Sequence, residues 1–234
     1  MTHISDNLLR VKQDINELET RFHRPQNSIS LLAVSKTKPT EDIIVAYNAG
    51  QRLFGENYVQ EAVAKHEALS AYKGIVWHFI GPIQSNKSRQ IAETMDWVHT
   101  VDREKIARRL SEQRPENMPP LNVLIQVNIS QESTKAGITL AELGEMVDLV
   151  NSLPNIILRG LMAIPAPQES EEAQIDVYRP LAAAYERLAK ENSQVDTLSI
   201  GMSNDLPAAI ASNSSLVRVG TAIFGARDYS NLNK

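Results

Sequence analysis

The 234-residue chain contains no cysteine. This absence excludes thiolate catalysis, disulfide bonds and iron–sulfur ligation, and it fits a reducing compartment. The five histidines show no metal-ligand spacing, and without cysteine a zinc cluster is not expected. No P-loop pattern is present either. Thiol and metal chemistry are therefore poor explanations of this sequence.

Long apolar runs and an excess of basic residues are also missing. No apolar run approaches the roughly 20 residues that span a bilayer. The first ten residues lack the charged-then-apolar pattern of a signal peptide. The net charge is -4, so there is no general basic field for nucleic acid. We therefore expect a cytoplasmic protein whose partners include neither a membrane nor nucleic acid.

Short apolar strand patterns alternate with amphipathic helix patterns along the chain. The predicted strands lie at residues 29–35, 52–55, 75–81, 97–101, 122–128, 156–163, 197–201 and 215–220. One further helix is predicted before the first strand. Thr139 and Glu142 predict a capping box. Pro180 predicts a kink or break in a long helix over residues 170–191.

Strands that alternate with helices predict parallel pairing through right-handed crossovers. About eight such units favour a closed (β/α)₈ barrel of the TIM type, a fold that has roughly 250 residues in one domain. An open doubly wound sheet is the alternative, but no Gly-x-Gly-x-x-Gly follows any early strand. No linker divides the pattern. We expect a single α/β barrel domain over residues 1–234, with an extra N-terminal helix.

Lys36 follows directly on the first predicted strand. Both faces of this strand are largely apolar, as in a parallel sheet that is covered on both sides. Leu32, Val34 and Lys36 share one face, because side chains alternate along a strand. An amine at the end of a buried strand loses hydration, which favours its neutral, nucleophilic form. We predict a Schiff base between Lys36 and an aldehyde cofactor; the alternative is a lysine that reaches back into water.

The loops after the seventh and eighth strands are rich in small residues. In a barrel, these two loops and the start of a short helix often hold phosphate. Gly201 and Ser203 follow the seventh strand, with Ser203 as a possible N-cap, and Gly220 and Thr221 follow the eighth. The alternative is that the glycines only permit tight turns. Asp205 nearby opposes an anion unless its side chain points away.

Arg218 interrupts the otherwise apolar last strand. A buried guanidinium must find an acceptor, because an unpaired buried charge is very costly. One possibility is a structural ion pair with Asp or Glu of a neighbouring strand. The other is donation to a pyridine ring nitrogen, as in some pyridoxal phosphate sites. The first and last strands are neighbours in a closed barrel, so a ring would then lie between Lys36 and Arg218.

Six blocks of the sequence resemble the pyridoxal phosphate homeostasis protein family. They are residues 33–39 (AVSKTKP), 54–61 (FGENYVQE), 77–87 (WHFIGPIQSNK), 159–162 (RGLM), 201–203 (GMS) and 217–225 (VRVGTAIFG). The resemblance covers essentially the whole chain. It implies that Lys36 carries pyridoxal 5′-phosphate as an aldimine and that Arg218 faces the ring nitrogen. It further implies that the phosphate binds to Ser203, Gly220 and Thr221. It also implies that Asn57, His78 and Met162 lie near the ring.

The sequence also resembles, more distantly, the barrel domain of alanine racemase. A racemase needs an acid or base on each side of the substrate α-carbon. That enzyme takes its second base from a subunit interface organised by an additional β domain, for which we see no counterpart here. An arginine beside the ring nitrogen also weakens the ring as an electron sink. We therefore expect a protein that stores, buffers or delivers the cofactor, without robust enzymatic activity of its own.

Three alternatives to cofactor storage remain. A weakly active pyridoxal phosphate-dependent racemase would share the same site. A Schiff-base aldolase-like barrel would also use a lysine and bind phosphate, but without a visible chromophore. An interaction protein would keep its partners after Lys36→Ala. For a cofactor carrier we expect a monomer and transient contact with apo-enzymes, with Lys38 and Lys135 as candidate relay amines.

Overall fold

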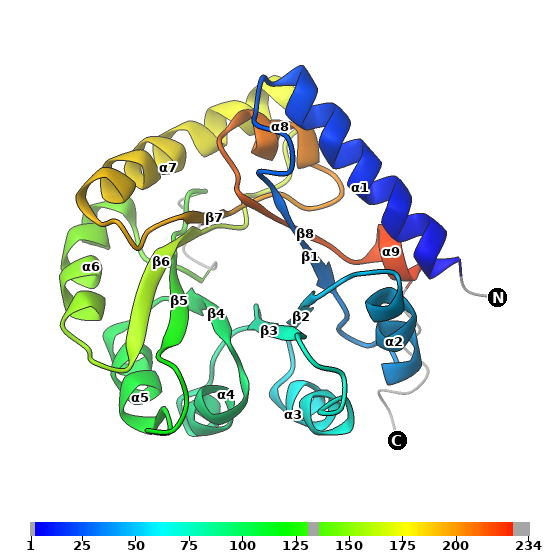
Figure 1. Cartoon of the computed structure of the whole chain (residues 1–234). Coiled ribbons are helices and arrows are strands. Elements are labelled where there is room, and N and C mark those ends of the chain that lie inside the picture. The colour runs from blue at the N-terminus through cyan, green and yellow to red at the C-terminus, as the bar shows by residue number, and fades with distance from the viewer. Residues whose placement is uncertain (1–2, 131–135, 227–234) are drawn as a thin grey trace.

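The computed structural model describes residues 3–130 and 136–226, which form a closed barrel of eight parallel strands surrounded by helices (Figure 1). The strands are β1 Ser30–Val34, β2 Leu53–Glu56, β3 Val76–Phe79, β4 Trp97–Val101, β5 Leu121–Gln126, β6 Ile156–Met162, β7 Thr197–Ser199 and β8 Leu216–Val219. They pair in chain order, and β8 closes on β1. The predicted (β/α)₈ barrel is confirmed, and the open sheet is wrong.

The helices lie on the outside of the barrel, and α2 to α8 connect successive strands. They are α1 Ile4–Arg21, α2 Thr40–Asn48, α3 Val59–Ala68, α4 Ser88–Thr94, α5 Glu104–Gln113, α6 Leu143–Asn151, α7 Glu171–Glu191, α8 Leu206–Ala211 and α9 Thr221–Phe224, with short 3₁₀ turns η1 Ser85–Lys87 and η2 Leu140–Glu142. The extra N-terminal helix is confirmed as α1, which lies along the outside beside α8 and α9 (Figure 1). Of the described helices, none is long and apolar enough to cross a membrane.

Two local predictions about helices have different outcomes. The capping box of Thr139 and Glu142 is present, at the start of η2. Pro180 does not break the long helix, because α7 continues through it as one element. A proline inside a helix forfeits one backbone hydrogen bond. Buried Tyr178 and Leu181 on either side of Pro180 anchor this part of α7 in the core.

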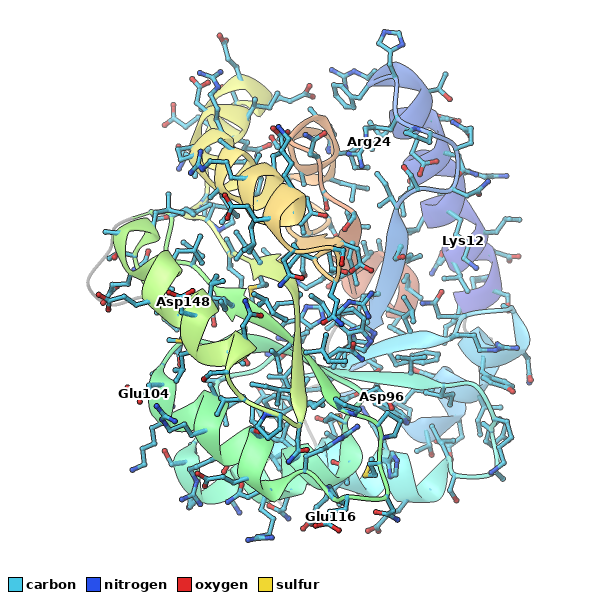
Figure 2. All side chains as sticks on the ribbon, turned by 60° about the vertical axis from the view of Figure 1, so that its left-hand side comes forward. Lys12, Arg24, Asp96, Glu104, Glu116 and Asp148 are labelled. Carbon is cyan, nitrogen blue, oxygen red and sulfur yellow. The ribbon has the colours of Figure 1, made fainter. Side chains whose placement is uncertain are left out.

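The outer wall of the barrel packs against the inner faces of the helices. Leu31 and Ala33 of β1, Phe54 of β2 and Phe79 of β3 belong to this apolar layer. Burial of apolar side chains there contributes about 25 cal/mol per Å² of surface removed from water. Charged side chains such as Glu104 of α5 and Asp148 of α6 lie on the exposed outside (Figure 2). This layer fixes the strands and thereby the positions of the loops at both ends of the barrel.

The inside of the barrel is unusually polar. Parallel pairing places Leu32 beside Arg218, and Gly55 beside His78. Residues paired in this way point to the same side of the sheet, here the interior. His78, His99, Ser199 and Arg218 are all buried within it. Barrel interiors are commonly filled with branched aliphatic side chains, so this polar filling indicates a site above it.

Candidate functional site

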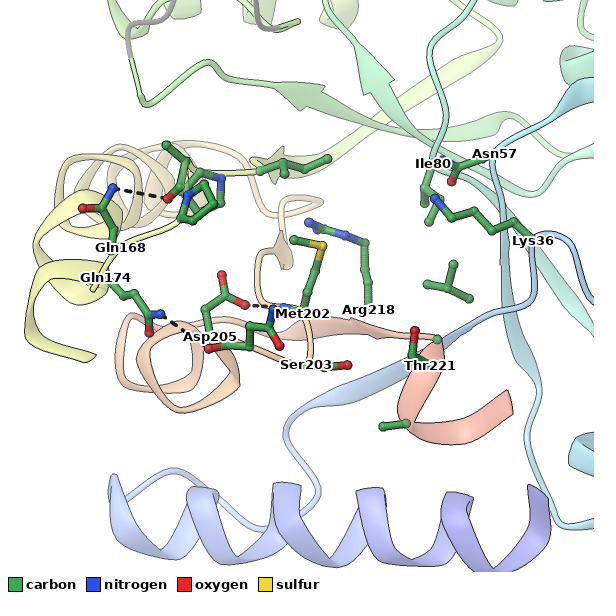
Figure 3. Close-up of a pocket in the computed structure, with 18 residues that line it drawn as sticks. Lys36, Asn57, Ile80, Gln168, Gln174, Met202, Ser203, Asp205, Arg218 and Thr221 are labelled. Atoms are coloured by element: carbon green, nitrogen blue, oxygen red, sulfur yellow. Dashed lines mark hydrogen bonds between the residues drawn. The ribbon is translucent and has the colours of Figure 1, made fainter. Parts of the chain in front are cut away.

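A cavity of about 740 Å³ opens at the carboxyl ends of the strands (Figure 3). Its walls come from the segments after β1, β2, β3, β6, β7 and β8, with Gln174 of α7 at the far side. The carboxyl ends of the strands are the functional end of such barrels. Six of the eight residues predicted from the sequence line this cavity: Lys36, Asn57, Ser203, Arg218, Gly220 and Thr221.

Lys36 reaches the cavity from the turn after β1, and Arg218 reaches it from the neighbouring strand β8. The strand β1 ends at Val34, so Lys36 lies in the turn that follows and not at the end of the strand itself. Arg218 is in β8, and its Cα pairs with that of Leu32. Both side chains extend into the space of the cavity (Figure 3). Barrel closure therefore brings together two residues that are far apart in the sequence.

The guanidinium of Arg218 is 4% exposed and is held by oxygens of the chain. One terminal nitrogen donates to the carbonyl and the hydroxyl of Ser199, both at 2.7 Å, and the other donates to the carbonyl of Ala163 at 3.0 Å. Among the described residues, no carboxylate forms an ion pair with Arg218 within 4.0 Å. Burial lowers the pKa of Arg218, and electrostatic interactions with Tyr178 and Asp205 oppose this effect.

Two histidines continue this network inside the barrel. Nδ1 of His99 lies 3.0 Å from the hydroxyl oxygen of Ser199, and Nε2 of His99 lies 2.8 Å from Nδ1 of His78. Burial lowers the pKa of His78 to about 3. Burial, together with electrostatic interactions with His78 and Arg218, also lowers the pKa of His99. Both rings are therefore neutral near pH 7, which avoids adding cations beside the buried guanidinium.

The proton positions of this network follow from Arg218. A guanidinium only donates, so the Ser199 hydroxyl accepts from it and has its own proton left for Nδ1 of His99. We assign the remaining protons accordingly, with Nε2–H of His99 donating to His78. Nε2 of His78 then carries a proton, and it is buried without a hydrogen-bond partner among the described residues. His78 stacks on Trp97 with ring centroids 5.3 Å apart.

The segment after β7 folds around Asp205. One carboxylate oxygen of Asp205 accepts from the Met202 N–H at 2.6 Å, and the other accepts from the Tyr178 hydroxyl at 2.6 Å. Asp205 is the N-cap residue of α8, so the prediction that Ser203 occupies this position is wrong. Ser203 is instead exposed in the cavity wall. Gly201 has a φ of 99°, a left-handed conformation that favours glycine.

The segment after β8 begins the one-turn helix α9. Gly220 is its N-cap residue, and Thr221 and Ala222 are its first two residues. All three line the cavity. A helix of four residues has no N–H partners within itself for its first turn. The N–H groups of Ile223 and Phe224 donate to the Gly220 carbonyl, which leaves the N–H groups of Thr221 and Ala222 and the exposed Thr221 hydroxyl as hydrogen-bond donors at the cavity wall.

Asn57 carries a further polar atom without a partner. Its side-chain oxygen is buried and accepts no hydrogen bond among the described residues, although the residue lines the cavity. Buried polar atoms are nearly always satisfied, so an orphaned one at a cavity indicates a missing ligand or water. The position of Asn57 directly after β2 explains its place in the wall.

The other predicted residues lie away from the cavity wall. His78 and Met162 are 1% and 0% exposed and line no part of the cavity; their contact with a cofactor stays a prediction. Lys38 donates to the carbonyls of Phe224 and Ala226, at 3.0 and 2.7 Å, which ties it to the end of α9. Lys135 lies outside the described residues.

Sequence reasoning missed one side of the cavity. Residues 164–168, which follow β6, and Gln174 of α7 form the wall opposite Lys36 (Figure 3). Gln168 and Gln174 donate to the carbonyls of Ala166 and Asn204. No charge or motif marks these residues in the sequence. The signal that could have found them is their place after a barrel strand, where every loop faces the same cavity.

Together, the fold and the site define a class of protein: a (β/α)₈ barrel with a small-molecule site at the carboxyl ends of its strands. The family described as alanine racemase, N-terminal domain, matches residues 7–228. A pyridoxal phosphate homeostasis protein of Escherichia coli strain K12 is 56% identical over 232 residues, which cover 98% of this chain and 99% of the relative. The chain belongs to the alanine racemase N-terminal domain family and, within it, to the pyridoxal phosphate homeostasis proteins.

Solved structures agree with this assignment. A protein of Bifidobacterium adolescentis, described as unknown, superposes with a TM-score of 0.89 at 33% identity and covers 95% of this chain and 94% of its own. The structure of PipY from Synechococcus elongatus with PLP bound has a TM-score of 0.77 at 34% identity, and the match covers 90% of this chain and all of PipY.

Proposed function

We propose that this chain binds pyridoxal 5′-phosphate (PLP) through Lys36 and takes part in PLP homeostasis by storing, buffering or delivering the cofactor. The observation that carries the proposal is the placement of Lys36, in the turn after β1, and of Arg218, in the neighbouring strand β8, around one cavity. The names of the curated relatives and the PLP in the PipY structure support it. We propose further that residues 1–234 form one domain.

The residues of the cavity fit this cofactor. PLP presents an aldehyde, a pyridine nitrogen and a phosphate, and the cavity presents an amine, a guanidinium, hydroxyls and backbone N–H groups. The orphaned oxygen of Asn57 indicates a ligand that also offers a donor. When bound, PLP supplies an aldehyde that condenses with an amine and loses water. The cavity of about 740 Å³ is within the range of small-molecule sites.

Each residue then has a distinct role. Lys36 holds the cofactor covalently. Arg218 donates to the ring nitrogen and keeps it unprotonated, because a guanidinium is never an acceptor. Ser203, Gly220 and Thr221 bind the phosphate through hydroxyl and N–H groups. The supporting observation is that these residues line the same cavity wall on the side of β7 and β8.

We propose that the chain has no dedicated reaction of its own. Of the described residues that line the cavity, the only titratable ones are Lys36, Asp205 and Arg218. Asp205 already accepts hydrogen bonds from Tyr178 and Met202. A racemase needs a second acid or base opposite the lysine. In the described part of the cavity wall, Asp205 and Arg218 are already hydrogen-bonded to other groups of the chain, so neither is available as this second acid or base.

Delivery of the cofactor would involve apo-enzymes that approach the open end of the barrel. Exposed apolar side chains gather on the segments at this end: Tyr58 after β2, Leu140 after β5, Ile164 after β6 and Met202 after β7. Single exposed apolar side chains are common on protein surfaces, so the support for a contact surface here is that these four share one end of the barrel. We propose a cytoplasmic monomer that meets these enzymes transiently.

An absorbance spectrum with and without borohydride tests cofactor binding. The purified protein with PLP should be yellow and should lose this colour on reduction, with the reduced label on the peptide that contains Lys36. Lys36→Ala should remain colourless, whereas Lys190→Ala, on the exposed end of α7, should behave like the unaltered protein. A colourless unaltered protein, or a label on another lysine, would refute the proposal. Rapid racemisation of amino acids would favour the enzyme.

A further inference from the structure

Lys36 lies in a turn whose backbone is in an uncommon conformation. Thr37, the next residue, has a φ of 63°. A β-branched residue rarely adopts a positive φ, and such a conformation persists only where the surroundings hold it in place. The direction of the Lys36 side chain depends on this turn, because the backbone angles of Lys36 set the direction of its Cα–Cβ bond.

Both peptide groups that flank Lys36 are bound by one cluster of charged side chains. The Ser35 carbonyl, on one side, accepts from Nζ of Lys65 at 2.7 Å. The Thr37 N–H, on the other side, donates to Glu61 at 2.6 Å. Lys65 also donates to Glu61 at 2.6 Å and to Glu56 at 2.8 Å. All three donors of the Lys65 ammonium are therefore used.

The cluster is buried between the barrel wall and α3. Glu56 is the last residue of β2 and is 0% exposed, and Lys65 of α3 is 5% exposed. The Ser35 hydroxyl donates to the same oxygen of Glu56 at 2.5 Å. Glu56, Glu61 and Lys65 line no part of the cavity. The cluster thus contacts the Lys36 backbone from behind the barrel wall.

We propose that Lys65, together with Glu56 and Glu61, is a positioning device that aims the Lys36 amine at the cofactor. This inference rests on the proposed function, because it assigns a purpose to the direction of Lys36. Fixing both flanking peptide planes fixes the backbone angles of the lysine between them. A buried ion pair adds little net stability compared with apolar side chains of the same size. The three polar side chains are better explained by the specific geometry that they impose on this turn.

The test compares two ligands that differ only at the reacting group. PLP carries the aldehyde, whereas pyridoxine 5′-phosphate carries an alcohol and cannot form the covalent bond. Lys65→Met and Glu61→Ala should each weaken PLP binding about tenfold or more, which corresponds to about 1.4 kcal/mol. Both variants should leave pyridoxine 5′-phosphate binding unchanged. If the variants bind both ligands more weakly to a similar extent, the site has loosened in general and the inference is overturned.

Matched variants separate positioning from stability. Glu61→Gln keeps an oxygen that accepts from Thr37 and Lys65, so it should retain most PLP affinity where Glu61→Ala loses it. Arg114→Met removes a buried guanidinium that donates to three backbone carbonyls near the opposite end of the barrel, and should leave PLP affinity unchanged even where it lowers stability.

The outcomes also separate this inference from the proposed function. Absence of a Lys36 adduct in the unaltered protein would refute PLP binding itself. A normal Lys36 adduct in the unaltered protein, with equal PLP affinity in both Lys65→Met and Glu61→Ala, would overturn the positioning device alone. Glu61 is 24% exposed, so its variants should fold even where Lys65→Met does not.

Discussion

The buried carboxyl of Glu56 predicts an unusual dependence of stability on pH. Burial raises the pKa of Glu56 from its ordinary 4.5 to about 7, although Lys65 and Ser35 act in the opposite direction. Between these two pH values the folded chain keeps a proton that the unfolded chain releases. The folded state then binds more protons, so the free energy of unfolding falls as the pH rises through this interval.

The size of the effect follows from the two pKa values. Each pH unit between the folded and unfolded pKa corresponds to about 1.4 kcal/mol. The ionisation of Glu56 therefore lowers the free energy of unfolding by about 3 kcal/mol between pH 4.5 and pH 7. This is a large share of the roughly 5–15 kcal/mol by which native domains are stable.

The perturbation is Glu56→Gln, which cannot ionise. Its amide oxygen still accepts from Ser35 and Lys65. Its NH2 group replaces the second carboxylate oxygen of Glu56, which is buried without a hydrogen-bond partner among the described residues. Burial of that unpaired donor lowers the free energy of unfolding of the variant, but by an amount that does not change with pH. Its stability relative to the unaltered protein should thus improve steadily as the pH rises.

The assay is urea unfolding at several pH values from about 5 to 8, with the difference between the two proteins as the readout. His78 and His99, whose pKa values are lowered by burial, add an opposite slope below their ordinary pKa of 6.5. The difference removes their contribution because both proteins contain them. Glu67→Gln, at an exposed position of α3, the helix that carries Lys65, is the control and should give a flat difference. A flat difference for Glu56→Gln as well would refute the reasoning.

Three further substitutions test the cavity wall. Tyr178→Phe removes the hydroxyl that donates to Asp205 and should lower the free energy of unfolding in urea by about 1–3 kcal/mol; an unchanged value would show that this bond contributes nothing. Gly81→Ala would place a Cβ 2.1 Å from the Asn57 carbonyl oxygen, so the segment that carries Asn57 must shift. PLP titration should then show weaker binding, and unaltered affinity would show that Asn57 does not belong to the site. Arg218→Leu should reduce PLP affinity about tenfold or more in the same titration, and full affinity would contradict its contact with the ring.

Much of the fold follows from the sequence, because the apolar periods of strands and helices alternate clearly. The predicted strand at 97–101 agrees with β4, and the others differ by at most two residues at either end. Closure then makes a specific prediction about Lys36 and Arg218, since the first and last strands must be neighbours. Because of this neighbourhood, the sequence alone predicts that Lys36 and Arg218 face one site, and both line the cavity.

The networks that hold these residues could not be predicted in the same way. His99 and Ser199 are 100 positions apart, and their contact depends on the register of strands that are not adjacent. Lys65 follows the pattern of a charged residue on a surface helix, yet it is 5% exposed. The positive φ of Thr37 has no sequence signal, because threonine seldom adopts it. Each feature arises from tertiary contacts that override local preference.

The two networks act on the proposed cofactor site from opposite sides of one wall. Ser199 and Ala163 hold Arg218 from inside the barrel, whereas Lys65 and Glu61 hold the Lys36 turn from outside. The separation between amine and guanidinium then depends on the pairing of β1 with β8 and on the turn after β1 that carries Lys36. A site built in this way is fixed before its ligand arrives, and pre-organisation of this kind reduces the ordering cost of binding.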